Sequence, residues 1–364
     1  MKWIARGGRK CRQEEVYMLH RDRRKSPHRS GCGTEGKLHS TSTEMEEVQT
    51  SLSLQMLQVA REVVQQSSLQ VIRTPLIHLP HGTIPMKINC NLYLKLENMQ
   101  TTGSFKIRGV ANQFSRKESG PFITMSAGNY GKAFAYASKH FGHRGKVLMV
   151  DTAPASKSAL IASYGVDVEQ MPAKSLMPTV EQLVKDQKMI FLHPFDDIDL
   201  IAGHGSIGLE ILEEIPNPDV VTVCCGGGGL LAGVAAAFKL SGCTTTNIYG
   251  VEPKEACTMY RSFCENKPVF MDAKSIATGL APPFAGSNSF QICKQHVKEI
   301  LLVSDDEIKA AVSMLYKIGL VVEPSGAAAF AAIVGEKINL EGKTVVVIIT
   351  GGNVSPEELC HIIH

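Results

Sequence analysis

The sequence predicts an α/β protein whose parallel sheets are covered by helices on both faces. Two observations carry this prediction. Short apolar runs alternate with helix-like segments between residues 122 and 192, and a second set of such runs follows between residues 220 and 349. Strands and helices in alternation are typical of βαβ units, whose strands run parallel. The length of 364 residues and the apolar content of 44% are enough for one double-lobed unit or for two domains.

The expected elements follow in order along the chain. An amphipathic helix is predicted over residues 44–66, and Thr74-Pro75 leads from it into an extended segment. A helix is predicted to begin at Lys106 after a turn at residues 101–103. Strands are predicted at 92–96, 122–125, 147–150, 166–170 and 189–192, and helices at 129–141, 156–164 and 179–186. The second set has strands near 220–224, 247–251, 300–303 and 344–349, with helices between them.

Basic residues are concentrated at the start of the sequence. Residues 1–40 hold 11 Lys and Arg against 4 Asp and Glu, which leaves 27 of 38 basic and 31 of 35 acidic residues for the rest. The rest is mildly acidic, and nothing in it indicates nucleic-acid binding. The polar segment 1–44 is expected to be a disordered basic extension. No apolar run approaches the roughly 18 residues that cross a membrane.

Localisation is expected to be cytoplasmic. The ten cysteines form no CxxC pair, which is typical of reduced thiols in a cytosolic protein. The extension lacks the apolar core of a secretory signal. Its Arg-rich composition leaves a mitochondrial transit peptide as the alternative, although Glu14, Glu15 and Asp22 are unusual for one.

Lys106 stands out among the candidate functional residues. It lies between an apolar strand and a helix, where a desolvated ammonium group is costly. Lysine is tolerated in such a place when it is neutral or covalently committed, as in a Schiff base with a carbonyl cofactor.

Four adjacent glycines, Gly226, Gly227, Gly228 and Gly229, follow the strand at 220–224 and open a helix. Such a turn lets main-chain N–H groups approach an anion at a helix N-terminus, so it predicts a phosphate site. A tight turn with close packing is the structural alternative. A dinucleotide fingerprint, with Gly227, Gly229 and Ala232 as GxGxxA, leaves Lys106 unexplained and is disfavoured.

Two further strand-to-helix turns carry polar groups. The turn Ser126-Ala127-Gly128-Asn129-Tyr130 suits a substrate carboxylate through its N–H groups, although it equally fits a plain helix N-terminus. Thr350 ends the last strand, where its hydroxyl is available to a ring nitrogen. All these turns lie where parallel sheets bind ligands, at the carboxyl ends of strands. The histidines show no metal-binding spacing.

These motifs resemble the fold-type II pyridoxal-phosphate (PLP) enzymes, in the branch of the serine/threonine dehydratases and serine racemase. The likeness extends from about residue 74 to residue 354. It includes the segments Lys95-Leu96-Glu97-Asn98 and Glu323-Pro324-Ser325-Gly326-Ala327. It implies a two-lobed architecture like that of the tryptophan synthase β chain. Residues 45–118 and 198–364 would form a large PLP-binding domain, and residues 119–197 a small domain facing the substrate.

The resemblance also implies roles for the residues. Lys106 would carry PLP as a Schiff base and act as the base for the α-proton, and Phe105 would pack against the ring. Asn129 would bind the 3′-oxygen, the four glycines would bind the phosphate, and Glu323 would lie beside the ring. Thr350 would meet the ring nitrogen. Ser126, Ala127, Gly128, Asn129 and Tyr130 would bind the substrate.

Three departures from the family pattern qualify this assignment. Ala127 stands where the racemase has an acid/base serine, which favours elimination over racemisation. Glu252 and Ala256 match two ligands of the family's divalent cation (Mg²⁺ or Ca²⁺), but Thr258 replaces the Asp, and a hydroxyl is a poorer ligand than a carboxylate. The usual Ala-Asp-Gly of the substrate loop is Ala277-Thr278-Gly279.

The sequence therefore predicts a PLP-dependent L-serine/L-threonine ammonia-lyase that acts on a small β-hydroxy amino acid as a homodimer. A serine or aspartate racemase is the first alternative. A β-replacement enzyme of the same fold, such as a threonine-synthase-like protein, is the second. A PLP-binding protein without turnover is the third.

Overall fold

The computed structural model describes residues 52–84 and 89–363, and their strands form two sheets. The larger sheet has the order β1 (Leu76–Leu79), β2 (Asn91–Leu96), β10 (Thr344–Ile349), β7 (Val220–Cys224), β8 (Asn247–Pro253) and β9 (Glu299–Val303). Strand β1 is antiparallel to β2, and every other neighbouring pair is parallel. The prediction of a mostly parallel sheet is thus confirmed.

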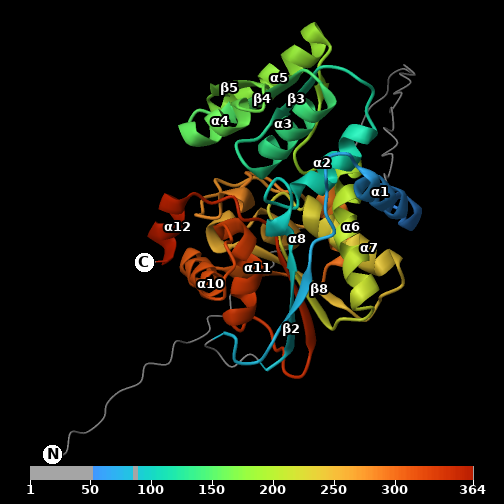
Figure 1. Ribbon diagram of the computed structural model, residues 1–364, viewed down its shortest axis with the longest axis vertical. Helices are drawn as coiled ribbons and strands as arrows, with labels where there is room; N and C mark the ends of the chain where they lie inside the picture. The colour runs from blue at the N-terminus through green and yellow to red at the C-terminus, as the bar shows by residue number, and fades with distance from the viewer. Residues whose placement is uncertain (1–51, 85–88, 364) are drawn as a thin grey trace, which may run out of the picture. The chain divides into compact units, whose positions relative to one another are not determined.

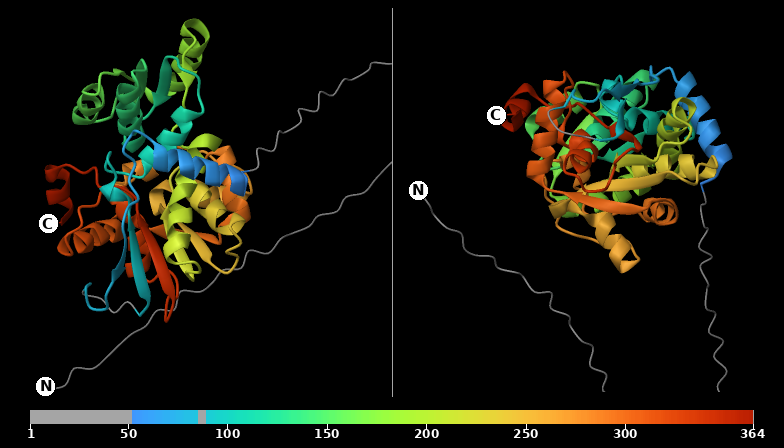
Figure 2. Two further views of the ribbon diagram at one scale, coloured as in Figure 1. Left: turned by 45° about the vertical axis from the view of Figure 1, so that its right-hand side comes forward. Right: turned by 90° about the horizontal axis from the view of Figure 1, so that it is seen from below.

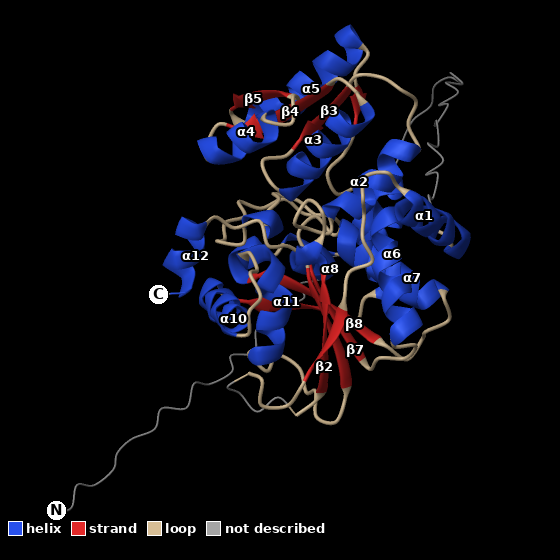
Figure 3. Cartoon of the chain, viewed as in Figure 1, coloured by secondary structure: helices blue, strands red, loops and turns tan. Residues whose placement is uncertain are grey.

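Side chains of the larger sheet alternate between two apolar layers. Val221 and Val223 pack on the side of α1 (Leu54–Gln66), α6 (Ile198–Glu214), α7 (Gly229–Leu240) and α9 (Ser287–His296). Val220, Val345 and Val347 pack on the other side, with α10 (Asp305–Lys317) and α11 (Pro324–Val334). Figure 3 shows the strands between these two groups of helices. Continuous Val and Ile runs fit strands that are buried on both faces.

The smaller sheet has the order β5 (Asp167–Met171), β4 (Gly145–Val150), β3 (Phe122–Met125) and β6 (Ile190–Phe191), with parallel pairs throughout. Phe122 and Val147 pack against α3 (Asn129–Phe141) and α4 (Ala155–Ala162). Ile123 and Leu148 pack on the opposite face against α5 (Ala173–Gln187). These helices lie around β3, β4 and β5 in Figure 1.

The remaining described elements are α2 (Lys106–Ser115), α8 (Thr258–Glu265), α12 (Pro356–Ile363) and the short 3₁₀ turns η1 (Glu97–Met99), η2 (Lys254–Ala256) and η3 (Thr278–Leu280). Helix α12 lies beside α10, as Figure 2 shows. In residues 52–84 and 89–363, no helix has the length and apolar content needed to cross a membrane.

Two predicted helix starts are wrong by more than one helical turn. Helix α1 begins at Leu54 because the Ser53 hydroxyl caps it, accepting the N–H of Met56 at 3.2 Å. Helix α5 begins at Ala173 and continues through Pro178, although an interior proline usually breaks a helix and led to the predicted start at 179. The predicted extension 1–44 lies outside the described residues, as does most of the helical segment predicted before Leu54. The division into domains at 118/119 and 197/198 stays a prediction.

Candidate active site

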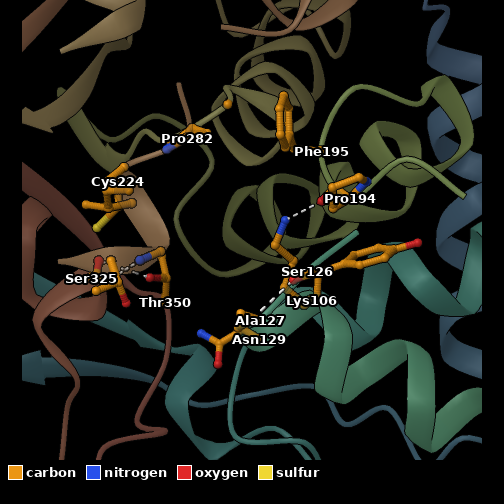
Figure 4. Close-up of a pocket in the computed structure, with 18 of the residues that line it drawn as sticks. Lys106, Ser126, Ala127, Asn129, Pro194, Phe195, Cys224, Pro282, Ser325 and Thr350 are labelled. Carbon is orange, nitrogen blue, oxygen red and sulfur yellow. Dashed lines mark hydrogen bonds between the residues drawn. The ribbon is translucent and has the colours of Figure 1, made fainter. Parts of the chain in front are cut away.

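A cavity of about 410 Å³ opens at the carboxyl ends of strands from both sheets. The residues that line it come from the turns after β3, β7 and β10, from the start of α2 and from loops that face them. They include each PLP-binding or substrate-binding residue predicted from the sequence: Phe105, Lys106, Ser126, Ala127, Gly128, Asn129, Tyr130, Gly226, Gly227, Gly228, Gly229, Glu323 and Thr350. The structure therefore brings turns that are far apart in the sequence to one place (Figure 4).

Lys106 is placed by a loop that is fastened to the end of β10. The N–H of Phe105 donates to the carbonyl of Thr350 at 3.0 Å, and Ser104 forms an isolated bridge with Gly351. Gly103 has a φ of 75°, and a Cβ atom there would overlap the side chain of Asn353. The loop therefore needs glycine at this point to reach Lys106, the first residue of α2.

The Lys106 amine faces the cavity in an apolar setting. Its Nζ donates to the carbonyl of Pro194 at 2.7 Å and lies 5.1 Å from the ring centre of Phe105 and 5.6 Å from that of Tyr130. Protein atoms surround the amine even though its tip is accessible from the cavity. This burial lowers the pKa of Lys106 to about 7, so a large fraction of the amine is neutral near pH 7.

The four glycines allow a close approach between the start of α7 and its neighbours. A Cβ at Gly227 would overlap the Phe195 ring, one at Gly229 would overlap the Phe195 carbonyl, and Gly228 has a φ of 98°. The N-cap of α7 makes no side-chain hydrogen bond, so the N–H groups of its first turn are left for a ligand. Backbone N–H groups at a helix N-terminus, without side chains in the way, are suited to a phosphate.

Asn129 belongs to a chain of hydrogen bonds along another wall. Its Nδ2 donates to Glu323, and its Oδ1 accepts from Nδ2 of Asn353 at 2.8 Å. Lys132 donates to Oδ1 of Asn353 at 2.7 Å. Burial raises the pKa of Glu323 to about 7, against the opposing effects of Asn129, Lys157 and Lys132. Asn129 is therefore held in one orientation at the cavity wall.

Thr350 lies near Cys224 and Ser325, on the side of the cavity away from the Lys106 amine (Figure 4). The Thr350 hydroxyl donates to the carbonyl of Ser325 over a long 3.4 Å. Burial raises the pKa of the Cys224 thiol to about 11, so this end of the cavity presents uncharged hydroxyl and thiol groups.

Tyr130 occupies the cavity wall with its ring only. Its hydroxyl donates to Oε1 of Gln113 at 2.5 Å and is buried. In the same turn, the Ser126 hydroxyl accepts the N–H of Gly128 at 3.3 Å. The side chains of this turn are therefore occupied in local contacts, and its substrate-binding capacity rests on main-chain N–H groups.

A sequence profile of the family described as pyridoxal-phosphate dependent enzyme matches residues 67–351. The chain belongs to this family. Among curated PLP-enzyme relatives, the catabolic L-threonine dehydratase of Staphylococcus aureus (strain N315) is 38% identical over 276 residues, which cover 72% of this chain and 79% of that protein.

Solved structures of similar PLP enzymes place the chain in the serine/threonine dehydratase branch. Serine racemase from Dictyostelium discoideum is 33% identical, with a TM-score of 0.75 over 84% of this chain and 99% of that one. The processed form of threonine deaminase isoform 2 from Solanum lycopersicum is 30% identical, with a TM-score of 0.76; the match covers 86% of this chain and 94% of that one. Maize serine racemase is 29% identical, with a TM-score of 0.78; the match covers 85% of this chain and 96% of that one.

The cavity fits PLP. For the aldehyde, it offers a partly buried amine with a lowered pKa. For the phosphate, it offers a glycine turn in which any side chain would be an obstruction. The amide of Asn129 and the neutral hydroxyl of Thr350 line the same cavity. The residue types and their placement thus match what the cofactor's functional groups require.

The predicted metal ligands do not fit a divalent cation. Both carboxylate oxygens of Glu252 accept N–H groups at the start of α8, from Met259 at 2.9 Å and from Tyr260 at 2.8 Å. Burial raises the pKa of Glu252 to about 8, and Thr258 adds only a neutral hydroxyl. Within residues 52–84 and 89–363, no cluster of three or more His, Cys, Asp or Glu side chains is suited to a metal. Glu252 serves as a helix cap instead.

The sequence analysis assigned no role in the site to several residues that line the cavity, namely Lys157, Pro194, Phe195, Cys224 and Ser325. The turn that carries Pro194 and Phe195 is closed by Nδ1 of His193, which accepts the N–H of Asp196 at 2.9 Å. Burial lowers the pKa of His193 and favours this neutral, accepting form. A His-Pro-Phe-Asp-Asp segment directly after a strand was the available signal, but only the fold places it over the glycine turn.

Proposed function

We propose that the protein is a PLP-dependent L-serine/L-threonine ammonia-lyase, which converts a small β-hydroxy amino acid into a 2-oxo acid and ammonia. The observation that carries this proposal is the Lys106 amine, which faces the cavity in an apolar setting and has a pKa lowered to about 7. The names of the similar proteins, threonine dehydratase and threonine deaminase, support the reaction class.

Each residue has a role in this proposal. Lys106 holds the cofactor covalently and, once released, accepts the α-proton of the substrate. The bound cofactor supplies the electron sink for that step. The N–H groups at residues 126–130 bind the α-carboxylate, Asn129 orients the ring, and Gly226, Gly227, Gly228 and Gly229 hold the phosphate. The Thr350 hydroxyl would lie at the ring nitrogen and would place no negative charge there to hold a proton, which would favour prompt β-elimination.

Elimination is favoured over racemisation by the side chain at position 127. Racemisation needs a second proton-transfer group at the α-carbon, and Ala127 has none. The turn's Tyr130 hydroxyl is committed to Gln113, and burial raises its pKa further. Proton transfer at the α-carbon is therefore assigned to Lys106.

The decisive experiment measures 2-oxo acid release from the purified holoenzyme with L-serine, L-threonine and their D-enantiomers. We expect 2-oxo acid and ammonia in equal amounts from the L-substrates. Rapid interconversion of L- and D-serine without ammonia would instead identify a racemase. Cofactor binding with neither product would identify a binding protein without turnover.

The homodimer and the cytoplasmic location belong to the same proposal. Light scattering coupled to gel filtration tests the first, and a monomer would contradict it. Imaging of the tagged full-length chain tests the second, and mitochondrial import would assign the segment 1–44 to targeting.

A further inference from the structure

A chain of side-chain hydrogen bonds connects Asn129 with a lysine that is not among the residues lining the main cavity. Lys132, the fourth residue of α3, donates from Nζ to Oδ1 of Asn353 at 2.7 Å. Asn353 donates from Nδ2 to Oδ1 of Asn129 at 2.8 Å, and Nδ2 of Asn129 donates to Glu323. The residue proposed to bind the 3′-oxygen of the cofactor is thus the third member of a chain that begins at an ammonium group.

The lysine agrees with one direction for every bond in this chain. An ammonium group donates hydrogen bonds and accepts none, so the Asn353 oxygen faces Lys132. The Asn353 nitrogen then points away, where it donates to Asn129 and to the carbonyl of Thr102 at 2.9 Å. Because Oδ1 of Asn129 accepts from Asn353, its Nδ2 is the atom that faces Glu323. This Nδ2 has two hydrogens, so one remains for an oxygen in the cavity.

Two glycines leave room for the amides. A Cβ atom at Gly103 would overlap Oδ1 of Asn353. A Cβ atom at Gly351 would overlap the Glu323 carboxylate and lie 3.2 Å from Nδ2 of Asn129. The backbone therefore restricts the space around both amides, in addition to the hydrogen bonds that orient them.

Lys132 connects two parts of the fold that are distant in the sequence. It lies three positions after Asn129, on the same side of α3, which packs on the smaller sheet. Asn353 follows β10 of the larger sheet, and it accepts from Lys132 and donates to Asn129. The two residues of α3 therefore hold one amide between them.

The charge of Lys132 acts on this amide. The side chain is half-buried, and burial lowers the pKa of Lys132 against the opposing effect of Glu323. Within residues 52–84 and 89–363, no Asp or Glu oxygen forms an ion pair with Lys132. An ammonium group with limited access to water and no carboxylate in contact polarises the acceptor that it does contact.

We propose that Lys132 is a positioning residue for the cofactor, which acts through Asn353 and Asn129 to orient and polarise the amide that binds the 3′-oxygen. A positive charge at one end of a hydrogen-bonded chain strengthens the donors further along it. A stronger donor at Asn129 favours the ionised form of the 3′-oxygen over its hydroxyl form. This inference rests on the PLP site of the proposed function.

The first test compares PLP with 3-deoxypyridoxal 5′-phosphate, an analogue that lacks the 3′-oxygen. Both are titrated into the cofactor-free full-length protein. Lys132→Met is expected to raise Kd for PLP by about 3- to 10-fold more than Kd for the analogue, because only PLP loses a hydrogen bond. An equal loss for both molecules would show general damage to the site and would overturn the proposal.

Two further variants control this comparison. Lys132→Arg keeps a charged donor, so it should retain most of the discrimination between PLP and the analogue. Lys139→Met removes an exposed lysine from the last turn of the same helix and should leave the discrimination at its wild-type value. Discrimination lost to the same extent in Lys132→Arg as in Lys132→Met, or lost in Lys139→Met, would contradict a role for the hydrogen-bonded chain.

Absorption spectra of the PLP-saturated proteins provide the second test. The visible band belongs to the form with an ionised 3′-oxygen, and a near-ultraviolet band belongs to the hydroxyl form. At one fixed pH, Lys132→Met should shift intensity from the visible to the near-ultraviolet band, whereas Lys139→Met should not. A looser site alone would weaken both bands together. Absence of any cofactor band in the wild type would refute the PLP site itself, whereas wild-type bands with an unchanged ratio in Lys132→Met would refute only the role of Lys132.

Discussion

The Lys106 amine combines a functional role with a cost to the stability of the cofactor-free protein. An ammonium group in this setting is destabilised, and the pKa falls from 10.5 to about 7. The folded state then binds fewer protons than the unfolded state between those two values. The cost of Lys106 is therefore complete below pH 7 and fades as the pH rises toward 10.5.

Lys106→Met in the cofactor-free protein should accordingly raise the free energy of unfolding. We expect the gain over the wild type to be largest at pH 6 and to shrink progressively between pH 7 and pH 10. Urea denaturation of both proteins across this range measures it. A gain that is independent of pH would show that packing, and not charge burial, causes the effect.

The same titration governs loading with the cofactor. Only the neutral amine attacks the aldehyde, so the rate of PLP attachment to the cofactor-free wild type should rise with pH through about 7. Stopped-flow absorbance follows the attachment, and Lys106→Met should show no visible absorption band. A rate that is flat between pH 6 and pH 8 would contradict the lowered pKa.

Ala127 is the residue that sets the proposed reaction outcome. Ala127→Ser would add a hydroxyl at the position where the family's racemase has its second acid/base group. We expect the ratio of serine racemisation to elimination to increase at least severalfold, because the α-carbon gains a second proton donor. Chiral chromatography of the remaining serine, together with ammonia release, gives this ratio, and Ala127→Gly is the control that adds no hydroxyl.

At the scale of elements, α2 is fixed by a buried set of charges. Arg108 donates to Glu97 on η1 at 2.8 Å and to Glu210 on α6 at 2.7 Å, and Lys95 on β2 also donates to Glu210 at 2.7 Å. All four side chains are almost completely buried. The set is balanced in charge, and it joins the start of α2 to three other elements.

Removal of one member would leave buried charges without partners. Arg108→Met is expected to lower the free energy of unfolding by about 3–5 kcal/mol. Arg116→Met, at the exposed C-terminal end of α2, should change it by less than about 0.5 kcal/mol. Denaturant titration measures both variants, and similar values for the two would contradict a structural role for the buried set.

The glycine turn at residues 226–229 and the loop that carries Phe195 also depend on each other. In Gly227→Ala the new methyl group would overlap the Phe195 ring, so the turn or the ring must move. We expect PLP to dissociate faster from this variant, because the phosphate site loses its geometry. Gly120→Ala, whose Cβ would meet only Ile190 at 3.2 Å, is the control. Retention of PLP at the wild-type rate would remove the glycine turn from the proposed cofactor site.

At the scale of the whole molecule, the cofactor should stabilise the fold through the turns that it joins. At a PLP concentration 100-fold above Kd, mass action adds about 2.7 kcal/mol to the free energy of unfolding. Differential scanning calorimetry should therefore show a Tm that rises with PLP concentration, and much less so for Lys106→Met. No shift in the wild type would contradict binding at this site.

The sequence was most informative where a structural feature is local. The limits of β3, β10 and α3 agree with the prediction, because apolar runs and turn residues mark them directly. The cavity residues were predicted from motifs that follow strands, since parallel strands bring such turns together. The start of α5 was missed because Pro178 is tolerated inside a helix here.

Features that depend on contacts between distant segments were not predicted. Arg108 and Glu210 are separated by 102 positions, and nothing in either local sequence indicates the other. Lys132 and Lys157 look like ordinary surface lysines until α3 and α4 place them on one cavity. Glu252 matched a metal ligand in sequence, yet the first turn of α8 takes up both of its oxygens.

The fastening of residues 103–105 to residues 350–351 has a consequence for biosynthesis. Strand β10 lies between β2 and β7 in the larger sheet. During translation, β2 and β7 therefore cannot complete their pairing until β10 has been synthesised. Such pairing over a long stretch of sequence is slow to form and leaves sheet edges exposed meanwhile. Until β10 has paired, residues 103–105 lack the segment to which they are fastened, so we expect cofactor capture to follow the pairing of this strand.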